Sequence, residues 1–280
     1  MEVDEHAQAR PAPALRPFVA FYSGYRQRGR PAGLHRGLPS PWLTLILTLD
    51  EPLVVAAHPD GRQAPGRYDS LIGGLHLSPA LIAMEGAQSG VQVAVHPLGC
   101  RALFGLPAAE LANVDADFAA VAGDAVVAEL RERLRLATSW PARFAALDEV
   151  LLRRVHEHKI HPDVAYAFGR LVQTGGRLSV ADLAAEIGWS GRHLTDRFRA
   201  EVGLRPKEAA RVARFDLARR RLRPGTRLAD LAVRHGYFDQ AHLAREFQAL
   251  AGCAPSQWLA DEFGFVQAGG GWPDEDESHD

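Results

Sequence analysis

The sequence predicts an α+β protein, in which a β-rich N-terminal region with a helical extension precedes an all-α region of two helix-turn-helix units joined by a long helix. Three observations support this class. Short apolar runs between Gly and Pro residues fill positions 10–100, apolar residues take helical spacing from about Pro107, and one pattern is written twice between Leu178 and Trp258. The 280 residues are enough for about two domains.

Runs of apolar residues between turn signals predict the strands. The clearest run is residues 42–49, Trp-Leu-Thr-Leu-Ile-Leu-Thr-Leu, which has Pro residues on both sides. Such a run suits a strand that is buried on one or both faces. Further strands are expected at residues 53–57, 71–77, 81–85 and 91–96. Several short strands separated by Gly and Pro are typical of a small barrel or sandwich.

The helical extension is predicted by apolar residues that recur at every third or fourth position. They form two groups, Leu130, Leu134 and Leu136, then Phe144, Leu147, Leu151 and Val155. We expect two amphipathic helices that are separated near Ser139-Trp-Pro141. The first domain is therefore placed at residues 1–158, with helices from about residue 107.

The pattern that is written twice covers residues 178–198 and 227–247. In each copy a Gly that can take the left-handed conformation ends one helix, and Ser190 or Asp239 offers an N-cap oxygen to the next. Apolar residues four positions apart pack that second helix inward. The matching residues are Leu183, Ala184, Gly188, Leu194 and Phe198 in the first copy, and Leu231, Ala232, Gly236, Leu243 and Phe247 in the second. Each copy predicts a helix-turn-helix.

The second helix of each copy leaves a polar face outward. This face carries Arg192, Thr195 and Arg199 in the first copy, and Gln240, Ala241 and Arg245, with His242 beside them, in the second. Arg and Gln make bidentate contacts to guanine and adenine edges, and Thr can meet a thymine methyl group. The repeated pattern therefore predicts a pair of DNA-reading helices.

A basic stretch from Pro206 to Pro224 joins the two copies. Its apolar residues can seat a rigid helix while its arginines stay charged; these are Val212, Phe215, Leu217 and Leu222, and Arg211, Arg214 and Arg219 to Arg221. A rigid connector would fix the separation of the two reading helices, and one turn of B-DNA is roughly 34 Å.

The charge distribution agrees with this interpretation, although the whole chain has a net charge of −2. Residues 170–258 hold 16 Lys or Arg against 9 Asp or Glu, a local charge of +7, whereas residues 259–280 hold 7 acids and no base. The positive field therefore coincides with the repeated pattern, as contact with phosphates requires. Residues 266–280 are expected to be a disordered acidic tail, either a solubilising extension or a competitor of DNA for the basic surface.

Residues 163–258 resemble the DNA-binding domain of the AraC/XylS family of bacterial transcription regulators. The residues that carry the resemblance are Leu183-Ala184, Gly188, Ser190, His193-Leu194, Arg197-Phe198, Gly203, Pro206, Arg214-Phe215 and Ala218, then Leu231-Ala232, Gly236-Tyr237-Phe238, Asp239-Gln240, Leu243, Arg245, Phe247, Gly252 and Pro255. The chain departs from the family at Asp196, where a basic residue is usual, so the phosphate contact expected there is in doubt. Residues 159–265 are accordingly expected to be an AraC-type DNA-binding domain.

The N-terminal half resembles the sensor domain of such regulators, a cupin-like barrel followed by helices, through residues 35–39 and 95–111. The resemblance implies a small-molecule effector, promoter or operator double-stranded DNA and RNA polymerase as partners, and a monomer or homodimer. It implies DNA contacts by Ser190, Arg192, His193, Thr195, Arg197, Arg199, Asp239, Gln240, Ala241, His242 and Arg245. Of these, Arg192, Thr195, Gln240 and His242 are expected to read bases, and Arg197, Arg199 and Arg245 to hold phosphates.

Two other classes compete with this interpretation. A ligand-binding or interaction protein could use the repeated helical domain as a protein-contact scaffold, since Asp196 and Glu246 moderate its positive field. A barrel enzyme fused to a reading domain is the other. The sequence has no phosphate-cradling Gly-rich loop after a strand and no His-Glu-x-x-His, so we expect no catalysis and no cofactor.

Metal and membrane partners are not expected either. The full metal-cupin motif is absent, and His35, His58, His76 and His96 are scattered singly. The N-terminal residues lack the charged and apolar regions of a signal peptide, and no apolar stretch approaches the ~20 residues of a membrane helix. We therefore expect a cytoplasmic protein.

Overall fold

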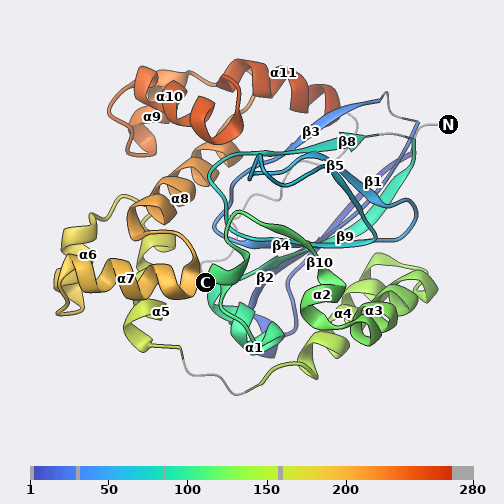
Figure 1. Ribbon diagram of the computed structural model, residues 1–280. Helices are drawn as coiled ribbons and strands as arrows, with labels where there is room; N and C mark the ends of the chain where they lie inside the picture. Colours follow the sequence, from blue (N-terminus) through green and yellow to red (C-terminus); the bar gives the residue numbers. More distant parts are fainter. Residues whose placement is uncertain (1–2, 30–31, 85, 157–159, 267–280) are drawn as a thin grey trace, which may run out of the picture.

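The computed structural model describes residues 3–29, 32–84, 86–156 and 160–266, with the side chains from residue 262 onward left aside. The expected acidic tail lies outside these residues from position 267 onward. In Figure 1 a β-sandwich occupies the middle of the molecule, and helices surround it on several sides. The strands are β1 Val3–Ala9, β2 Val19–Arg28, β3 Gly33–Gly37, β4 Leu43–Thr48, β5 Leu53–Ala57, β6 Gly66–Tyr68, β7 Ser70–Gly73, β8 Ala80–Met84, β9 Gln88–Val95 and β10 Asp115–Asp117.

Two sheets form the sandwich. The larger has the order β1-β2-β9-β4-β7-β10 and the smaller β3-β8-β5-β6, and the strands pair antiparallel throughout. Strand β4 is central because it pairs with both β7 and β9. Its residues alternate between two environments: Leu43, Leu45 and Leu47 are fully buried on one face, whereas Thr44 and Ile46 border a cavity on the other. The α+β class and the β-rich N-terminal region expected from the sequence are confirmed, and the strands of that region form two sheets.

Helices follow and partly cover the larger sheet. The helices are α1 Cys100–Phe104, α2 Phe118–Ala122, α3 Asp124–Leu136, α4 Trp140–Leu152, α5 Pro162–Gln173, α6 Val180–Glu186, α7 Gly191–Val202, α8 Pro206–Arg221, α9 Leu228–Arg234, α10 Gln240–Ala251 and α11 Pro255–Val266, with short 3-10 turns η1 Pro13–Leu15, η2 Pro97–Gly99 and η3 Ala108–Leu111. The two expected amphipathic helices are α3 and α4. Ser139 caps α4 by accepting a hydrogen bond from the Ala142 N–H.

Helix α4 packs against the larger sheet through aromatic and polar contacts. The rings of Tyr22 and Phe144 stack at 5.7 Å, and the Tyr22 hydroxyl donates a hydrogen bond of 2.9 Å to Asp148. In Figure 1 the green helices α2 to α4 lie beside β4 and β9, on the side of that sheet away from β3 and β5. The apolar face of the larger sheet is therefore buried under the helical extension.

The structure adds the strands β1, β2, β3 and β6, which the sequence did not predict, and it differs from the prediction at two further places in this half. Strand β7 ends at Gly73 instead of residue 77. The chain turns at Gly74, where the backbone of Leu111 approaches so closely that a Cβ on Gly74 would lie 1.6 Å from its carbonyl oxygen. The region from Pro107 is also not helical throughout, since Asp115–Asp117 adds β10 to the edge of the larger sheet.

Candidate nucleic-acid interface

The first helix-turn-helix unit, residues 178–202, is formed by α6 and α7. Gly188 has a φ of +70°, the left-handed conformation that lets the chain turn between the two helices. The Ser190 side chain then accepts a hydrogen bond of 3.2 Å from the His193 N–H, which satisfies one of the unpaired donors at the start of α7. The N-cap predicted at Ser190 is therefore present in the structure.

The second unit, residues 227–251, repeats this geometry with α9 and α10. Gly236 has a φ of +72°, and Asp239 accepts a hydrogen bond of 2.6 Å from the His242 N–H. Its turn is one residue longer, because Gly236 precedes Leu243 by seven positions whereas Gly188 precedes Leu194 by six. The longer turn contains Phe238, whose side chain is 89% exposed beside the reading helix.

The inward faces of both reading helices are buried as predicted. Leu194 and Phe198 in the first unit, and Leu243 and Phe247 in the second, are at most 1% exposed. Phe198 packs on Phe168 of α5, with ring centroids 6.3 Å apart. Burial of these faces fixes the side of each helix that remains outward.

In the first unit the outward face is basic. Arg192, Arg197 and Arg199 are exposed, and none of them forms an ion pair with another described residue. Thr195 donates its hydroxyl to the Gly191 carbonyl at 2.7 Å, so its polar atom is engaged within the helix. The methyl group is then the part of Thr195 that is available for an apolar contact with a base.

In the second unit Gln240, Ala241 and Arg245 are exposed at the outward face, as predicted. His242 is only partly exposed. Its Nδ1 accepts a hydrogen bond of 3.2 Å from the Phe238 N–H, and its ring lies edge-on to Tyr237 at 5.4 Å. These contacts make His242 a support of the turn.

His193 occupies the matching position in the first unit and packs in the same way. Its ring lies edge-on to the ring of Trp189 at 4.5 Å, and its backbone N–H is bonded to Ser190. Each histidine therefore holds the aromatic residue that follows the turn glycine. A glycine followed by an aromatic residue occurs in both units, and this repeated spacing could have predicted the two ring contacts from the sequence.

The acidic residues on the reading helices have different surroundings. Glu246 points to the connector helix and accepts a hydrogen bond of 2.9 Å from Arg211, which raises the pKa of that guanidinium above its usual value. Glu201 pairs with Arg101 of the N-terminal half at 2.8 Å. Asp196 alone is exposed among the three. Glu246 is thus neutralised behind the reading face, contrary to the expectation that it weakens the positive field there.

The connector predicted between the units is α8, and it is held on several sides. Val212 and Phe215 are buried as predicted, but Leu217 is 40% exposed because it lies at the surface beside Gly175. Arg214 donates a hydrogen bond of 2.9 Å to the Gly176 carbonyl. The buried Asp216 pairs with Arg219 at 2.6 Å and with Arg220 at 2.8 Å.

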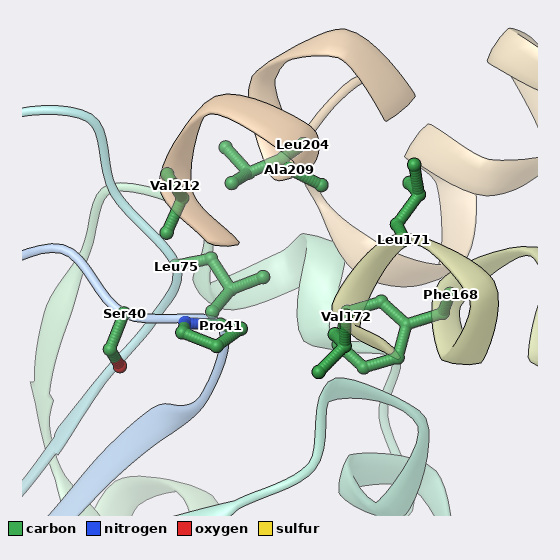
Figure 2. Close-up of a pocket in the computed structure, with 9 residues that line it drawn as sticks. All are labelled: Ser40, Pro41, Leu75, Phe168, Leu171, Val172, Leu204, Ala209 and Val212. Atoms are coloured by element: carbon green, nitrogen blue, oxygen red, sulfur yellow. The ribbon is translucent and has the colours of Figure 1, made fainter. Parts of the chain in front are cut away.

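The helical region also packs on the β region. Figure 2 shows Phe168, Leu171 and Val172 of α5 and Ala209 and Val212 of α8 gathered against Pro41 and Leu75 of the β region. These side chains leave a space of only about 10 Å³, which is close to the volume that one water molecule needs. The two halves are therefore in direct apolar contact.

Comparison with known proteins adds a family assignment to this geometry. Residues 183–261 match the family model of a helix-turn-helix domain, and residues 7–117 match a domain of unknown function, DUF6597. The C-terminal domain is an AraC-type helix-turn-helix domain. The chain is a DNA-binding transcription regulator. None of the curated proteins compared matches it significantly.

Three solved structures illustrate the likeness of fold. The C-terminal domain of AraT, a response regulator from Geobacillus stearothermophilus, is 20% identical, with 37% of this chain and 88% of that chain covered and a TM-score of 0.35. The DNA-binding domain of AdpA, a global transcriptional factor in complex with a target DNA, is 23% identical, with 38% and 98% covered and a TM-score of 0.36. An apo variant of ToxT from Vibrio cholerae is 10% identical, with 85% and 97% covered and a TM-score of 0.52.

No three His, Cys, Asp or Glu side chains gather as metal ligands within the ranges that the structure describes. None of the helices in those ranges combines the length and apolar composition needed to cross a bilayer.

Proposed function

We propose that this regulator places α7 and α10 in successive major-groove segments on one face of promoter or operator DNA. The observation that carries the proposal is that arginines lie exposed on the outward faces of these helices, whereas two of the three acidic residues on the helices are paired behind those faces. Arg192, Arg199 and Arg245 are exposed outward, whereas Glu201 and Glu246 are paired with arginines behind the reading faces. Such uncommitted cations are suited to contacts with phosphates and with guanine edges.

The roles of the individual residues follow from their surroundings. Arg192, Thr195 and Gln240 lie within the first two turns of the reading helices and are proposed to read bases. Arg197, Arg199 and Arg245, with Ala241 lining the second face, are proposed to follow the phosphate backbone. Ser190, Asp239, His193 and His242 hold the turns and act through helix position. RNA polymerase as a partner and a monomer or homodimer stay predictions.

The same proposal assigns control to the β region. A cavity of about 780 Å³ lies between the two sheets, a size that accommodates a small organic ligand. Because the halves pack directly, a ligand there can alter the reading helices without a flexible relay. We keep the predicted division into residues 1–158, 159–265 and 266–280, and a cytoplasmic site of action, as parts of this proposal.

The test is the binding of fluorescent DNA from upstream of the gene, against a scrambled sequence, across a salt series. Neutralised phosphates release counterions, so the affinity for the upstream DNA should fall steeply as salt rises. Arg192→Ala combined with Arg199→Ala should abolish most of this affinity. Arg67→Ala, a matched exposed arginine on β6, should leave it unchanged. Equal binding of both DNAs, or no effect of the double variant, would contradict the proposal.

A further inference from the structure

We propose that Phe238, in the turn of the second unit, makes an apolar contact with the 5-methyl group of a thymine in the major groove, beside the base that Gln240 reads. The contact rests on the proposed function, because it requires α10 to lie in that groove. Phe238 is then a further residue that determines which DNA sequence the chain prefers.

Phe238 is the most exposed large apolar side chain among the described residues, at 89%. It directly precedes Asp239, the N-cap of α10. An apolar residue at this position often packs on the fourth residue of the helix and so fixes the entry of the chain. That fourth residue, Leu243, is 1% exposed and faces inward, whereas Phe238 stays in water. Phe238 therefore does not stabilise the start of α10 in this way.

The backbone of the turn nevertheless holds Phe238 in a defined place. Its N–H donates a hydrogen bond of 3.2 Å to Nδ1 of His242, and the neighbouring Asp239 accepts a hydrogen bond of 2.6 Å from the His242 N–H. The preceding residue, Tyr237, is 4% exposed and so takes the inward side of the turn. Residues 238–241 are exposed in succession, so Phe238 continues the outward face of α10 at its first turn.

The neighbours of Phe238 suit base edges better than the phosphate backbone. The exposed carboxylate of Asp239 repels phosphates, and the amide of Gln240 matches adenine. The apolar group that base edges offer in the major groove is the thymine methyl, and Phe is among the side chains that contact it. Adenine pairs with thymine, so such a methyl group lies in the base pair that Gln240 reads or in the next one.

The first unit does not offer the same contact. Its shorter turn has no residue between Trp189 and the N-cap Ser190. The ring of Trp189 already packs on His161 and His193, with ring centroids 4.9 and 4.5 Å apart. We therefore expect the methyl contact in only one of the two DNA segments.

The experiment removes single methyl groups from bound DNA. A duplex is first selected from a random pool by its binding to the full-length chain. Each of its thymines is then replaced in turn by deoxyuridine, which lacks only the 5-methyl group. For one thymine the replacement should lower the affinity about three- to fivefold, as expected for the loss of one buried methyl group. With Phe238→Ala the same replacement should change nothing.

Matched variants assign the effect to the ring. Phe238→Leu should keep part of the difference between thymine and uracil, because Leu retains apolar surface. Val233→Ala is the control and should keep the whole difference, since Val233 is a 73% exposed apolar residue on α9 of the same unit. Urea unfolding should show no loss of stability for Phe238→Ala, because the side chain it removes is exposed.

Three results would overturn the inference. One is a duplex in which no thymine methyl matters to the wild-type chain. Another is an equal loss of affinity for the thymine and uracil duplexes in Phe238→Ala, which would place the ring against the sugar–phosphate backbone. The third is unchanged DNA affinity of Phe238→Ala, which would leave the ring to a protein partner.

Failure of the proposed function would look different. If the selection yields no bound duplex at all, DNA reading by α7 and α10 is contradicted and the methyl contact falls with it. A bound duplex without a methyl effect contradicts the contact of Phe238 alone.

Discussion

The two helix-turn-helix units share one geometry but are attached to the rest of the molecule in different ways. The first reading helix, α7, touches the N-terminal half directly, through the Arg101–Glu201 pair at 2.8 Å and through Gly203, where a Cβ would lie 2.9 Å from Ala112. The second, α10, rests on α8 and α11, and at its C-cap a Cβ on Gly252 would lie 3.3 Å from Pro79 of the β region. The first helix is therefore joined to the N-terminal half by an ion pair and a close approach, and the second by a close approach alone and through its neighbouring helices.

Their outward faces also differ. The first unit presents three exposed arginines, Arg192, Arg197 and Arg199, together with Asp196, whereas the second presents Gln240 and Arg245 beside the exposed Phe238. Guanidinium groups favour guanine and phosphate, and a Gln amide favours adenine. We therefore expect the first unit to supply most of the electrostatic affinity for DNA and the second to contribute a different base preference.

The largest expected effect is on the free energy of unfolding, and it shows whether the two units are equally well packed. Phe198→Ala and Phe247→Ala should each lower the free energy of unfolding by about 3–5 kcal/mol, the usual cost of removing a fully buried Phe. Urea unfolding of each variant measures the loss. A cost below about 1 kcal/mol for either residue would show that its unit is not the close-packed structure described.

A smaller effect separates base reading from phosphate contact between the units. Arg192→Ala should relax discrimination at one or two base positions by about 1–3 kcal/mol. Arg245→Ala should weaken binding to all sequences alike and make the salt dependence shallower. Competition with single-base variants of a bound DNA measures both. A uniform loss from both changes would mean that Arg192 is misassigned as a base reader.

The smallest effect concerns the ion pairs that join each unit to the β region. Arg101→Gln removes the pair to α7 and Arg36→Gln the pair to Asp261 on α11; each partly exposed pair should cost about 1 kcal/mol or less. The two variants should differ in their effect on DNA binding, since only Arg101→Gln perturbs the first unit. Equal losses of affinity at the DNA segments bound by the two units would show that the units move as one body.

Local rules were enough to predict the helical domain. The turn glycines, the caps at Ser190 and Asp239, and the buried pairs four residues apart all act within one unit, so a single sequence contains them. The partners of Glu201 and Glu246 could not be predicted in this way. They come from Arg101 and Arg211, residues far away along the chain, and pairing of that kind depends on tertiary packing.

The β region was predicted less completely for a related physical reason. Strands such as β4 are buried and read as apolar runs, but β1 and β3 are edge strands with polar residues, and they give no comparable signal. The mixed wall of the cavity could not be predicted at all. It combines side chains from both sheets with Arg220 and Trp258 of the helical domain.

The central claim is that α7 and α10 read two major-groove segments on one face of DNA. Protection of guanine N7 from methylation tests it most directly, because this atom lies in the major groove. We expect two protected segments about 10 base pairs apart, roughly one helical turn, with Arg192→Ala removing protection in only one of them. A single protected segment, or protection that Arg192→Ala leaves intact in both, would contradict it.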